Sequence, residues 1–184
     1  HDRQSSLPAL VDIVGQQIAA HPGNYLVYFS SFAYLTQFEA AFVARFPDVA
    51  LQRQHSGMSA HNRQQFLERF HQGEPILALA VLGGIFGEGI DLVGEKLIGA
   101  FIVTLGLPQW NPVNEQLKQR LQQRYGKGYL YAYLYPGLQK VVQAAGRVIR
   151  TDADQGFVYL LDTRFNDADI RQYLPSWWHI SDLH

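Results

Sequence analysis

Hydrophobic and polar positions alternate along the chain in two patterns, one typical of helices and the other of buried strands. Apolar residues recur at helical spacing from Leu7 to Ala20, after which the sequence HPGN breaks the pattern. The next run, YLVYF at 25–29, is rich in strand-forming residues. Ser30 and Ser31 follow it as candidate N-caps of a helix over 32–46. The chain is therefore predicted to begin with a helix, a strand and a second helix.

The alternation continues to the end of the chain. Near-continuous apolar runs at 76–82 and 97–105 are typical of strands whose sheet is covered on both faces. Repeated strand-helix alternation predicts an α/β fold of the RecA-like kind, with a mostly parallel sheet and helices on both faces. Ligands of such folds bind at the carboxyl ends of the strands. The remaining predicted elements are strands at 48–52 and 156–162 and helices from Ser59 to Gly73, from Pro112 to Gly126 and over 137–150.

Composition narrows the class of protein. The chain has 184 residues, 47% of them hydrophobic, which suits one domain with a sizeable core. A formal net charge of -1 gives no global positive field, so any binding to phosphates must be local. Cysteine is absent, which excludes thiolate metal sites and thiol nucleophiles and agrees with a cytoplasmic location. The longest apolar run is too short for a membrane span of about 20 residues, and we expect no membrane partner.

Two arginines lie near the end of the predicted 137–150 helix, and the main functional question is what these two cations bind. Gln143, Gly146, Arg147 and Arg150 fall at helical spacing on one stripe, apart from the apolar stripe. Neighbouring cations repel each other, and a helical glycine costs about 1 kcal/mol relative to alanine. One explanation is an anion held by the arginines, with Gly146 permitting its close approach.

The alternative is a solvated basic face whose arginines pair with Asp152, Asp154 or Asp162, because surface ion pairs near helix ends are common. Spacing alone leaves these two explanations even. The loop FGEGID, where Glu88 and Asp91 flank Gly89, is only weak support for metal binding or acid-base chemistry, because it is one carboxylate pair without histidine or further acids. No metal ligand set is expected in the chain.

The segment QAAGRVIR, at 143–150, resembles motif VI (Q-x-x-G-R-x-x-R) of superfamily 2 helicases. Its continuation TDADQGFVYLLDTRF is similar to the XPD and DinG group. Upstream, GGIFGEGIDL resembles that group's motif V, YFSSF its motif IV, and HSGMSAHNRQQFLERFHQGE the segment between them. The resemblance covers nearly the whole chain, with the motifs in family order.

The resemblance implies that residues 1–184 are the C-terminal, second RecA-like domain of a helicase motor, cut from a longer chain. In that family ATP and Mg²⁺ lie between the two motor domains, and motif VI arginines reach the γ-phosphate. Arg150 is then preferred over Arg147 as the arginine finger, and Gln143 positions the nucleotide or its attacking water. Asp91 contacts the ribose or braces motif VI, while Glu88 and the Gly89 backbone couple nucleotide state to DNA. Gly87 departs from the family's usual serine.

The resemblance also implies a surface for single-stranded DNA. Ser30 and Ser31 precede a helix, whose free N–H groups favour phosphate, and ordinary capping is the alternative. Arg63 is a further candidate contact, with a solvated face as its alternative. Trp110 could stack on a base, although packing against a neighbouring domain is the favoured role.

The chain lacks other parts that an ATPase needs. There is no G-x-x-x-x-G-K-[ST] motif and no D-E-x-H box, so the chain alone is expected to be inactive. The resemblance assigns those parts to an N-terminal motor domain, together with any iron-sulfur cluster, since this chain has no cysteine. The function predicted is that of an ATP-dependent DNA helicase domain, 5′ to 3′ by resemblance. The alternatives are a non-catalytic RecA-like binding module and a nuclease-helicase fusion.

Overall fold

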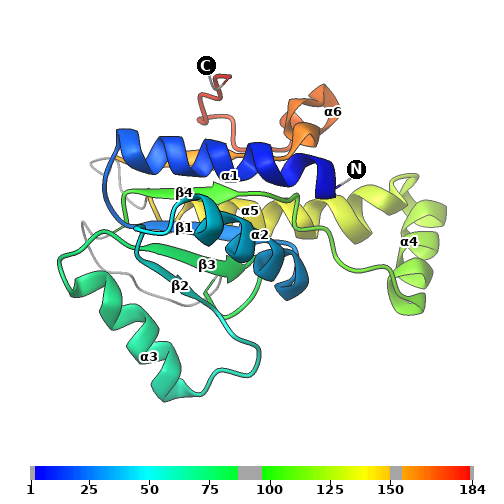
Figure 1. Ribbon diagram of the computed structural model, residues 1–184. Coiled ribbons are helices and arrows are strands. Elements are labelled where there is room, and N and C mark those ends of the chain that lie inside the picture. The colour runs from blue at the N-terminus through cyan, green and yellow to red at the C-terminus, as the bar shows by residue number, and fades with distance from the viewer. Residues whose placement is uncertain (1–2, 87–96, 150–154, 183–184) are drawn as a thin grey trace.

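The computed structural model describes residues 3–86, 97–149 and 155–182. These ranges contain six α-helices and five strands, together with short 3₁₀ segments and one π-helical segment (Figure 1). The helices are α1 Arg3–Ala20, α2 Phe32–Arg45, α3 Ala60–Glu68, α4 Pro112–Tyr125, α5 Tyr135–Ala145 and α6 Ala168–Arg171. The strands are β1 Tyr25–Phe29, β2 Leu51–Arg53, β3 Leu77–Val81, β4 Gly99–Ile102 and β5 Phe157–Leu160. The 3₁₀ segments are η1 Arg69–His71 and η3 Thr163–Asn166, and the π-helical segment is η2 Leu130–Leu134.

The five strands form one parallel sheet in the order β2-β3-β1-β4-β5. The register places Phe29 of β1 beside Val81 of β3, so these two neighbouring strands end at the same level. Parallel strands need crossover connections, and helices supply them between β1 and β2, between β2 and β3, and between β4 and β5. The predicted parallel sheet with helices on both faces is confirmed, and its carboxyl edge collects the loops after β1 and β3.

Alternate residues of the central strand β1 face two separate apolar cores. Tyr25, Val27 and Phe29 pack with buried residues of α1 and α2 on one face. Leu26 and Tyr28 pack with buried residues of α3, η1 and α5 on the other face. This is the period of a strand covered on both sides. All five β1 residues are buried, and the sheet is therefore a rigid base for the loops at its edge.

One predicted helix boundary is wrong in a way that matters for function. Instead of running over 137–150, α5 begins at Tyr135, directly after the π-helical η2, and ends at Ala145 with Gly146 as its C-cap. Glycine is a poor helix former, and its N–H still bonds to the carbonyl of Val142 at 2.9 Å. Gly146 and Arg147 therefore lie in a turn and not on a helical stripe that includes Gln143. Strands β3 and β4 are also shorter than the apolar runs that predicted them.

Gly137 fixes the start of α5 against the loop that follows β4. A Cβ atom at this position would lie 2.5 Å from the carbonyl oxygen of Leu105 and 3.1 Å from the backbone nitrogen of Leu107. Alanine would gain about 1 kcal/mol in helix propensity but would push two backbone segments apart, at a cost of about 1–3 kcal/mol. We expect Gly137→Ala to lower the free energy of unfolding by about 1 kcal/mol, measured by urea denaturation.

The matched control for this substitution is Gly146→Ala, at the C-cap of the same helix. Its Cβ would meet only ordinary contacts at 3.4 and 3.5 Å, and the residue has a right-handed helical conformation with φ of -64°. The unfolding free energy of Gly146→Ala should therefore change by less than about 0.5 kcal/mol. Equal losses for both variants would show that the close approach at Gly137 does not limit stability.

Candidate functional site

The two serines after β1 have different roles. Ser31 is the N-cap of α2, and its Oγ accepts a hydrogen bond from the backbone N–H of Tyr34 at 3.3 Å. Ser30 is not a cap, and its Oγ is buried without a hydrogen-bond partner among the described residues. A buried unpaired hydroxyl costs about 1–3 kcal/mol. Rotation of this side chain toward solvent would offer the hydroxyl to a ligand beside the first turn of α2.

The loop after β3 begins with a glycine turn next to these serines. The backbone N–H of Leu82 donates to the carbonyl of Phe29 at 2.9 Å, which ties the ends of the two strands together. Gly83 has a φ of +72°, and a Cβ at Gly84 would lie 2.9 Å from the carbonyl oxygen of Val81. Both positions therefore require glycine.

Two residues that were not predicted from the sequence hold this turn. Gln54, only 5% exposed, accepts a hydrogen bond at its Oε1 from the backbone N–H of Val81 at 2.9 Å. Lys140 of α5 lays its aliphatic stem against Gly83. Gln54 lies two residues after the strand predicted at 48–52, and that position is the one signal in the sequence that could have identified it. The side chain of Lys140 places a cation at the carboxyl edge of the sheet.

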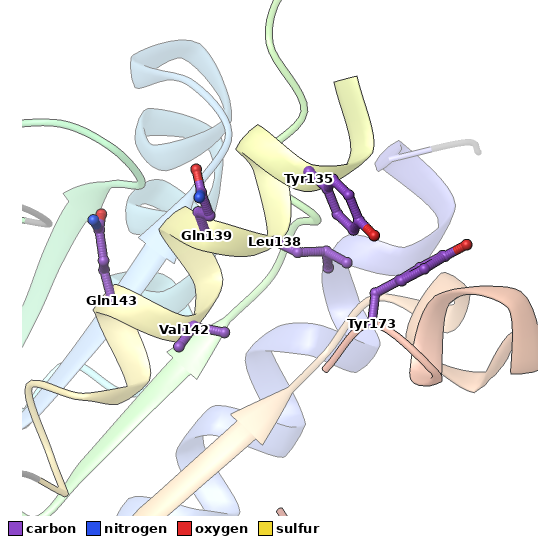
Figure 2. Close-up of a pocket in the computed structure, with 6 residues that line it drawn as sticks. All are labelled: Tyr135, Leu138, Gln139, Val142, Gln143 and Tyr173. Atoms are coloured by element: carbon purple, nitrogen blue, oxygen red, sulfur yellow. The ribbon is translucent and has the colours of Figure 1, made fainter. Parts of the chain in front are cut away.

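Gln143 is exposed and lies at one end of a shallow groove along the outer face of α5 (Figure 2). The groove has a volume of about 530 Å³, and its other lining residues are Tyr135, Leu138, Gln139, Val142 and Tyr173. Figure 2 shows the two tyrosine rings at the end opposite Gln143. The predicted nucleotide-positioning residue is therefore open to a partner.

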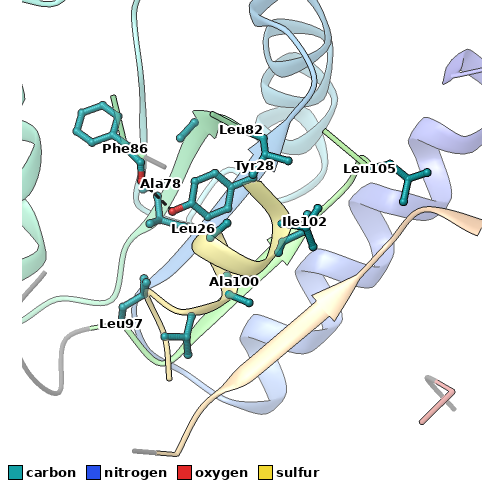
Figure 3. Packing of buried hydrophobic residues seen from close by; sticks show 14 of the residues in the cluster. Leu26, Tyr28, Ala78, Leu82, Phe86, Leu97, Ala100, Ile102 and Leu105 are labelled. Carbon is teal, nitrogen blue, oxygen red and sulfur yellow. Dashed lines mark hydrogen bonds between the residues drawn. The ribbon is translucent and has the colours of Figure 1, made fainter. Parts of the chain in front are cut away.

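Arg147 lies close to a buried tyrosine on the sheet. The hydroxyl of Tyr28 donates to the carbonyl of Phe86 at 3.0 Å beneath the loop that follows β3 (Figure 3). Burial raises the pKa of the Tyr28 hydroxyl well above its usual value, and the positive charge of Arg147 acts in the opposite direction. The turn after α5 and the loop after β3 thus meet at Tyr28, which the sequence prediction missed.

Several of the predicted site residues lie outside the described residues. These are Arg150 and the loop residues Glu88, Gly89 and Asp91, together with Gly87. Phe86 is the last described residue before that loop, so its bond to Tyr28 fixes the point from which the loop departs. Of the three carboxylates considered as ion-pair partners, Asp162 is engaged by Arg164 through contacts of 2.6 and 2.8 Å. The other two, Asp152 and Asp154, are outside the described residues.

Two further candidates lie away from the serines. Arg63 is exposed on α3, where its Nε donates to the carbonyl of Met58 at 3.3 Å. Trp110 is 73% exposed in the loop before α4. Its ring therefore packs little within the domain and is available to a ligand or another domain.

Some kinds of site find no support in the parts of the chain that the structure describes. No three His, Asp or Glu side chains there are grouped to hold a metal ion. Within the same ranges, no helix has both the length and the apolar character needed to cross a membrane. Cysteine is absent from the whole sequence.

A RecA-like helicase domain is the class that the parallel sheet and its edge loops define. The chain matches the family described as "Helicase C-terminal domain" over residues 14–181. It belongs to this family, as the C-terminal domain of an XPD- and DinG-like superfamily 2 helicase.

Two curated proteins illustrate the relationship. The chain is 29% identical over 180 residues to the probable ATP-dependent helicase MJ0942 of Methanocaldococcus jannaschii, with 90% of the chain and 27% of that protein covered. It is 25% identical over 167 residues to the XPD helicase subunit of general transcription and DNA repair factor IIH of Dictyostelium discoideum, with 85% and 21% covered. The chain therefore spans about a quarter of the length of these relatives.

Solved structures agree on the fold. A structure of apo XPD superposes with a TM-score of 0.69 at 22% identity, covering 88% of this chain and 33% of the other. Domain 2 of the DEAD-box helicase Mss116p, bound to an RNA duplex, gives a TM-score of 0.54 at 11% identity, covering 91% and 57%. The RecA-like helicase fold is thus shared well beyond the XPD group.

Proposed function

We propose that this domain is the second motor domain of an ATP-dependent DNA helicase that moves 5′ to 3′ on single-stranded DNA. The N-terminal motor domain of the full-length protein would hold ATP and Mg²⁺, and the two motor domains together would form the nucleotide-binding cleft. The observation that carries the proposal is the order of motifs on a domain of this family, with the exposed Gly146 and the partly buried Arg147 in the turn after α5. The proposed direction comes from the resemblance to DinG and XPD.

The nucleotide side of the proposal assigns each residue a role. Arg150 is the arginine finger, and Arg147 assists in stabilising the charge that develops on the γ-phosphate. Gln143, exposed at the end of the α5 groove, positions the nucleotide or the attacking water. A Cβ at Gly146 would make only ordinary contacts, at 3.4 and 3.5 Å, so the fold itself does not demand glycine there. Close approach of a phosphate gives a reason for that glycine.

Binding of ATP is proposed to reach DNA through the loop after β3. Asp91 would contact the ribose or brace the arginines, and Glu88 and the Gly89 backbone would transmit the change. The Tyr28 bond to Phe86 supports this coupling, because it links the start of the loop to strand β1, which Ser30 directly follows.

The DNA side uses the carboxyl edge of the sheet. Ser30 and the first turn of α2, capped by Ser31, would bind a backbone phosphate, since free N–H groups at a helix start favour anions. Arg63 would add a second phosphate contact. Trp110, exposed at 73%, would stack on a base or pack against the other motor domain.

Strand displacement by the full-length protein tests the proposal. We expect ATP-dependent release of a labelled strand from a duplex with a 5′ single-stranded tail, and little release from one with a 3′ tail. A duplex without a tail and a reaction without ATP are the controls. Binding of the tailed DNA without displacement or ATP hydrolysis would contradict the proposal and favour a binding module without motor activity.

A further inference from the structure

Four tyrosine rings form a continuous chain on the surface beyond the start of α5. Tyr125 at the end of α4, Tyr131 of η2, Tyr135 of α5 and Tyr173 after α6 are its members, named here the tyrosine chain. Successive ring centroids are 5.8, 5.5 and 5.2 Å apart, with interplanar angles of 69°, 62° and 88°. The last two rings form the end of the α5 groove in Figure 2.

Tyr125, Tyr131 and Tyr135 lie outside both apolar cores, and Tyr173 packs against one of them as a partly buried residue. Tyr125 is 53% exposed and Tyr131 39% exposed, and the other two rings are half-buried. Helix α4, which carries the first ring, has no buried residue. Exposed rings in edge-to-face contact gain little from burial, so stability alone does not explain four of them in a row.

The segment that carries Tyr125 and Tyr131 is rich in positive charge, although the whole protein carries a net charge of -1. Residues 112–131 contain four basic side chains and a single carboxylate, Glu115. That carboxylate is already engaged, because it accepts hydrogen bonds from Lys118 and from the hydroxyl of Tyr133, both at 2.7 Å. Arg120, Arg124 and Lys127 are exposed, and none of them forms an ion pair with another described residue.

The segment that carries the rings and cations is held in place by backbone contacts. The N–H of Gly128 donates to Oε1 of Gln122 at 2.9 Å, and a Cβ at Gly128 would collide with the carbonyl of Lys118. Gly137 then packs against the loop that follows β4. Figure 1 shows α4 beyond the end of the sheet toward which the strand arrows point. The tyrosine chain therefore continues from the same edge as Ser30.

We infer that the tyrosine chain, with Arg120, Arg124 and Lys127, is a second binding surface for single-stranded DNA. The inference rests on the proposed function and extends it beyond the serine edge. Aromatic rings bind bases by stacking without regard to sequence, and neighbouring cations bind the phosphates. Arg124 lies over the Tyr125 ring with its Cζ 5.3 Å from the centroid, so one base and one phosphate could be contacted at adjacent positions.

The exposed positive charges favour nucleic acid over a protein as the partner of this surface. A protein docking surface of this size would be depleted of charge at its centre. Here three exposed cations lie on the segment that carries Tyr125 and Tyr131, which is the pattern expected of a groove for single strands. Docking of another protein becomes an outcome of the test.

The test measures binding of the full-length protein to a fluorescent oligothymidine by anisotropy, without ATP. We expect the double variant Tyr125→Ala/Tyr131→Ala to bind about tenfold or more weakly, from a stacking contribution of about 1–3 kcal/mol per base. The matched control is Tyr129→Ala. Tyr129 is also 53% exposed on the same segment, but its ring stacks on Tyr133 and lies outside the tyrosine chain. This control should bind like the wild type.

An abasic strand separates stacking from charge. The double tyrosine variant should bind the abasic strand with the affinity of the wild type, because that strand has no bases on which the tyrosine rings could stack. Arg120→Ala/Arg124→Ala should weaken binding to oligothymidine and to the abasic strand alike. It should also make the slope of log K against log salt concentration less steep, by about 0.7 for each lost phosphate contact. Wild-type affinity of the double variant for oligothymidine would overturn the inference alone and leave protein docking as the use of the rings. Absence of any DNA binding by the wild type would overturn the proposed function as well.

Discussion

Replacing Arg150 with alanine in the full-length protein is expected to lower the rate of DNA-stimulated ATP hydrolysis by ~10³-fold or more. The affinity for single-stranded DNA should stay nearly unchanged. A guanidinium at the γ-phosphate stabilises charge that is present only in the transition state, so its removal affects turnover much more than ground-state binding. Steady-state phosphate release with and without DNA measures this effect.

Two further variants make the Arg150 result specific. Arg150→Lys keeps a positive charge but loses the planar, bidentate geometry, and should recover only a small part of the rate. Arg45→Ala removes an arginine that is exposed at the end of α2, where it pairs with Asp12 at 3.4 Å, and should hydrolyse ATP normally. Turnover by Arg150→Ala within a few-fold of the wild type would assign the arginines to a solvated basic face instead.

The largest expected effect on stability comes from Phe101 in β4. Its side chain is fully buried, stacked on Tyr159 with ring centroids 4.6 Å apart and lying 5.4 Å from the ring of Tyr25. Phe101→Ala would leave a cavity where three rings now meet, and we expect it to lower the free energy of unfolding by about 3–5 kcal/mol. The total free energy of unfolding of a domain is only about 5–15 kcal/mol. Urea denaturation of the 184-residue chain followed by circular dichroism measures the change.

Phe157→Ala is the control for this experiment. Phe157 lies on the edge strand β5 and is 39% exposed, although it also stacks on His21 at 4.4 Å. Its loss should cost about 1 kcal/mol. If Phe101→Ala costs no more than Phe157→Ala, the sheet would have to relax around the cavity much more freely than a close-packed core allows.

The elements that could be predicted from sequence are those with strong local signals. The YLVYF run predicts β1 with both of its boundaries, and Asn111 caps α4 one residue before Pro112, where that helix was predicted to begin. Both follow from side chains and their nearest neighbours along the chain. The end of α5 was not predicted, because the apolar stripe continues through Val148 while the backbone already turns at Gly146.

In the candidate site, too, features with a local sequence signal were predicted and features that depend on distant contacts were not. Ser31 as a cap is a local feature, and its prediction is confirmed. Tyr28 and Gln54 were missed, since each is recognised by a contact with a residue far along the chain: Phe86, 58 positions away, and Val81, 27 positions away. Such contacts arise only once parallel strands are side by side. The roles of Gln143, Arg147 and Arg150 stay predictions, because they depend on a second domain.

The central claim is that these arginines act on a phosphate held by another domain. The most direct measurement is ATP hydrolysis by the full-length protein and by the 184-residue chain alone, each with and without single-stranded DNA. The account predicts hydrolysis by the full-length protein that DNA stimulates, and none by the chain alone. Hydrolysis by the chain alone, or none by the full-length protein with DNA present, would contradict it.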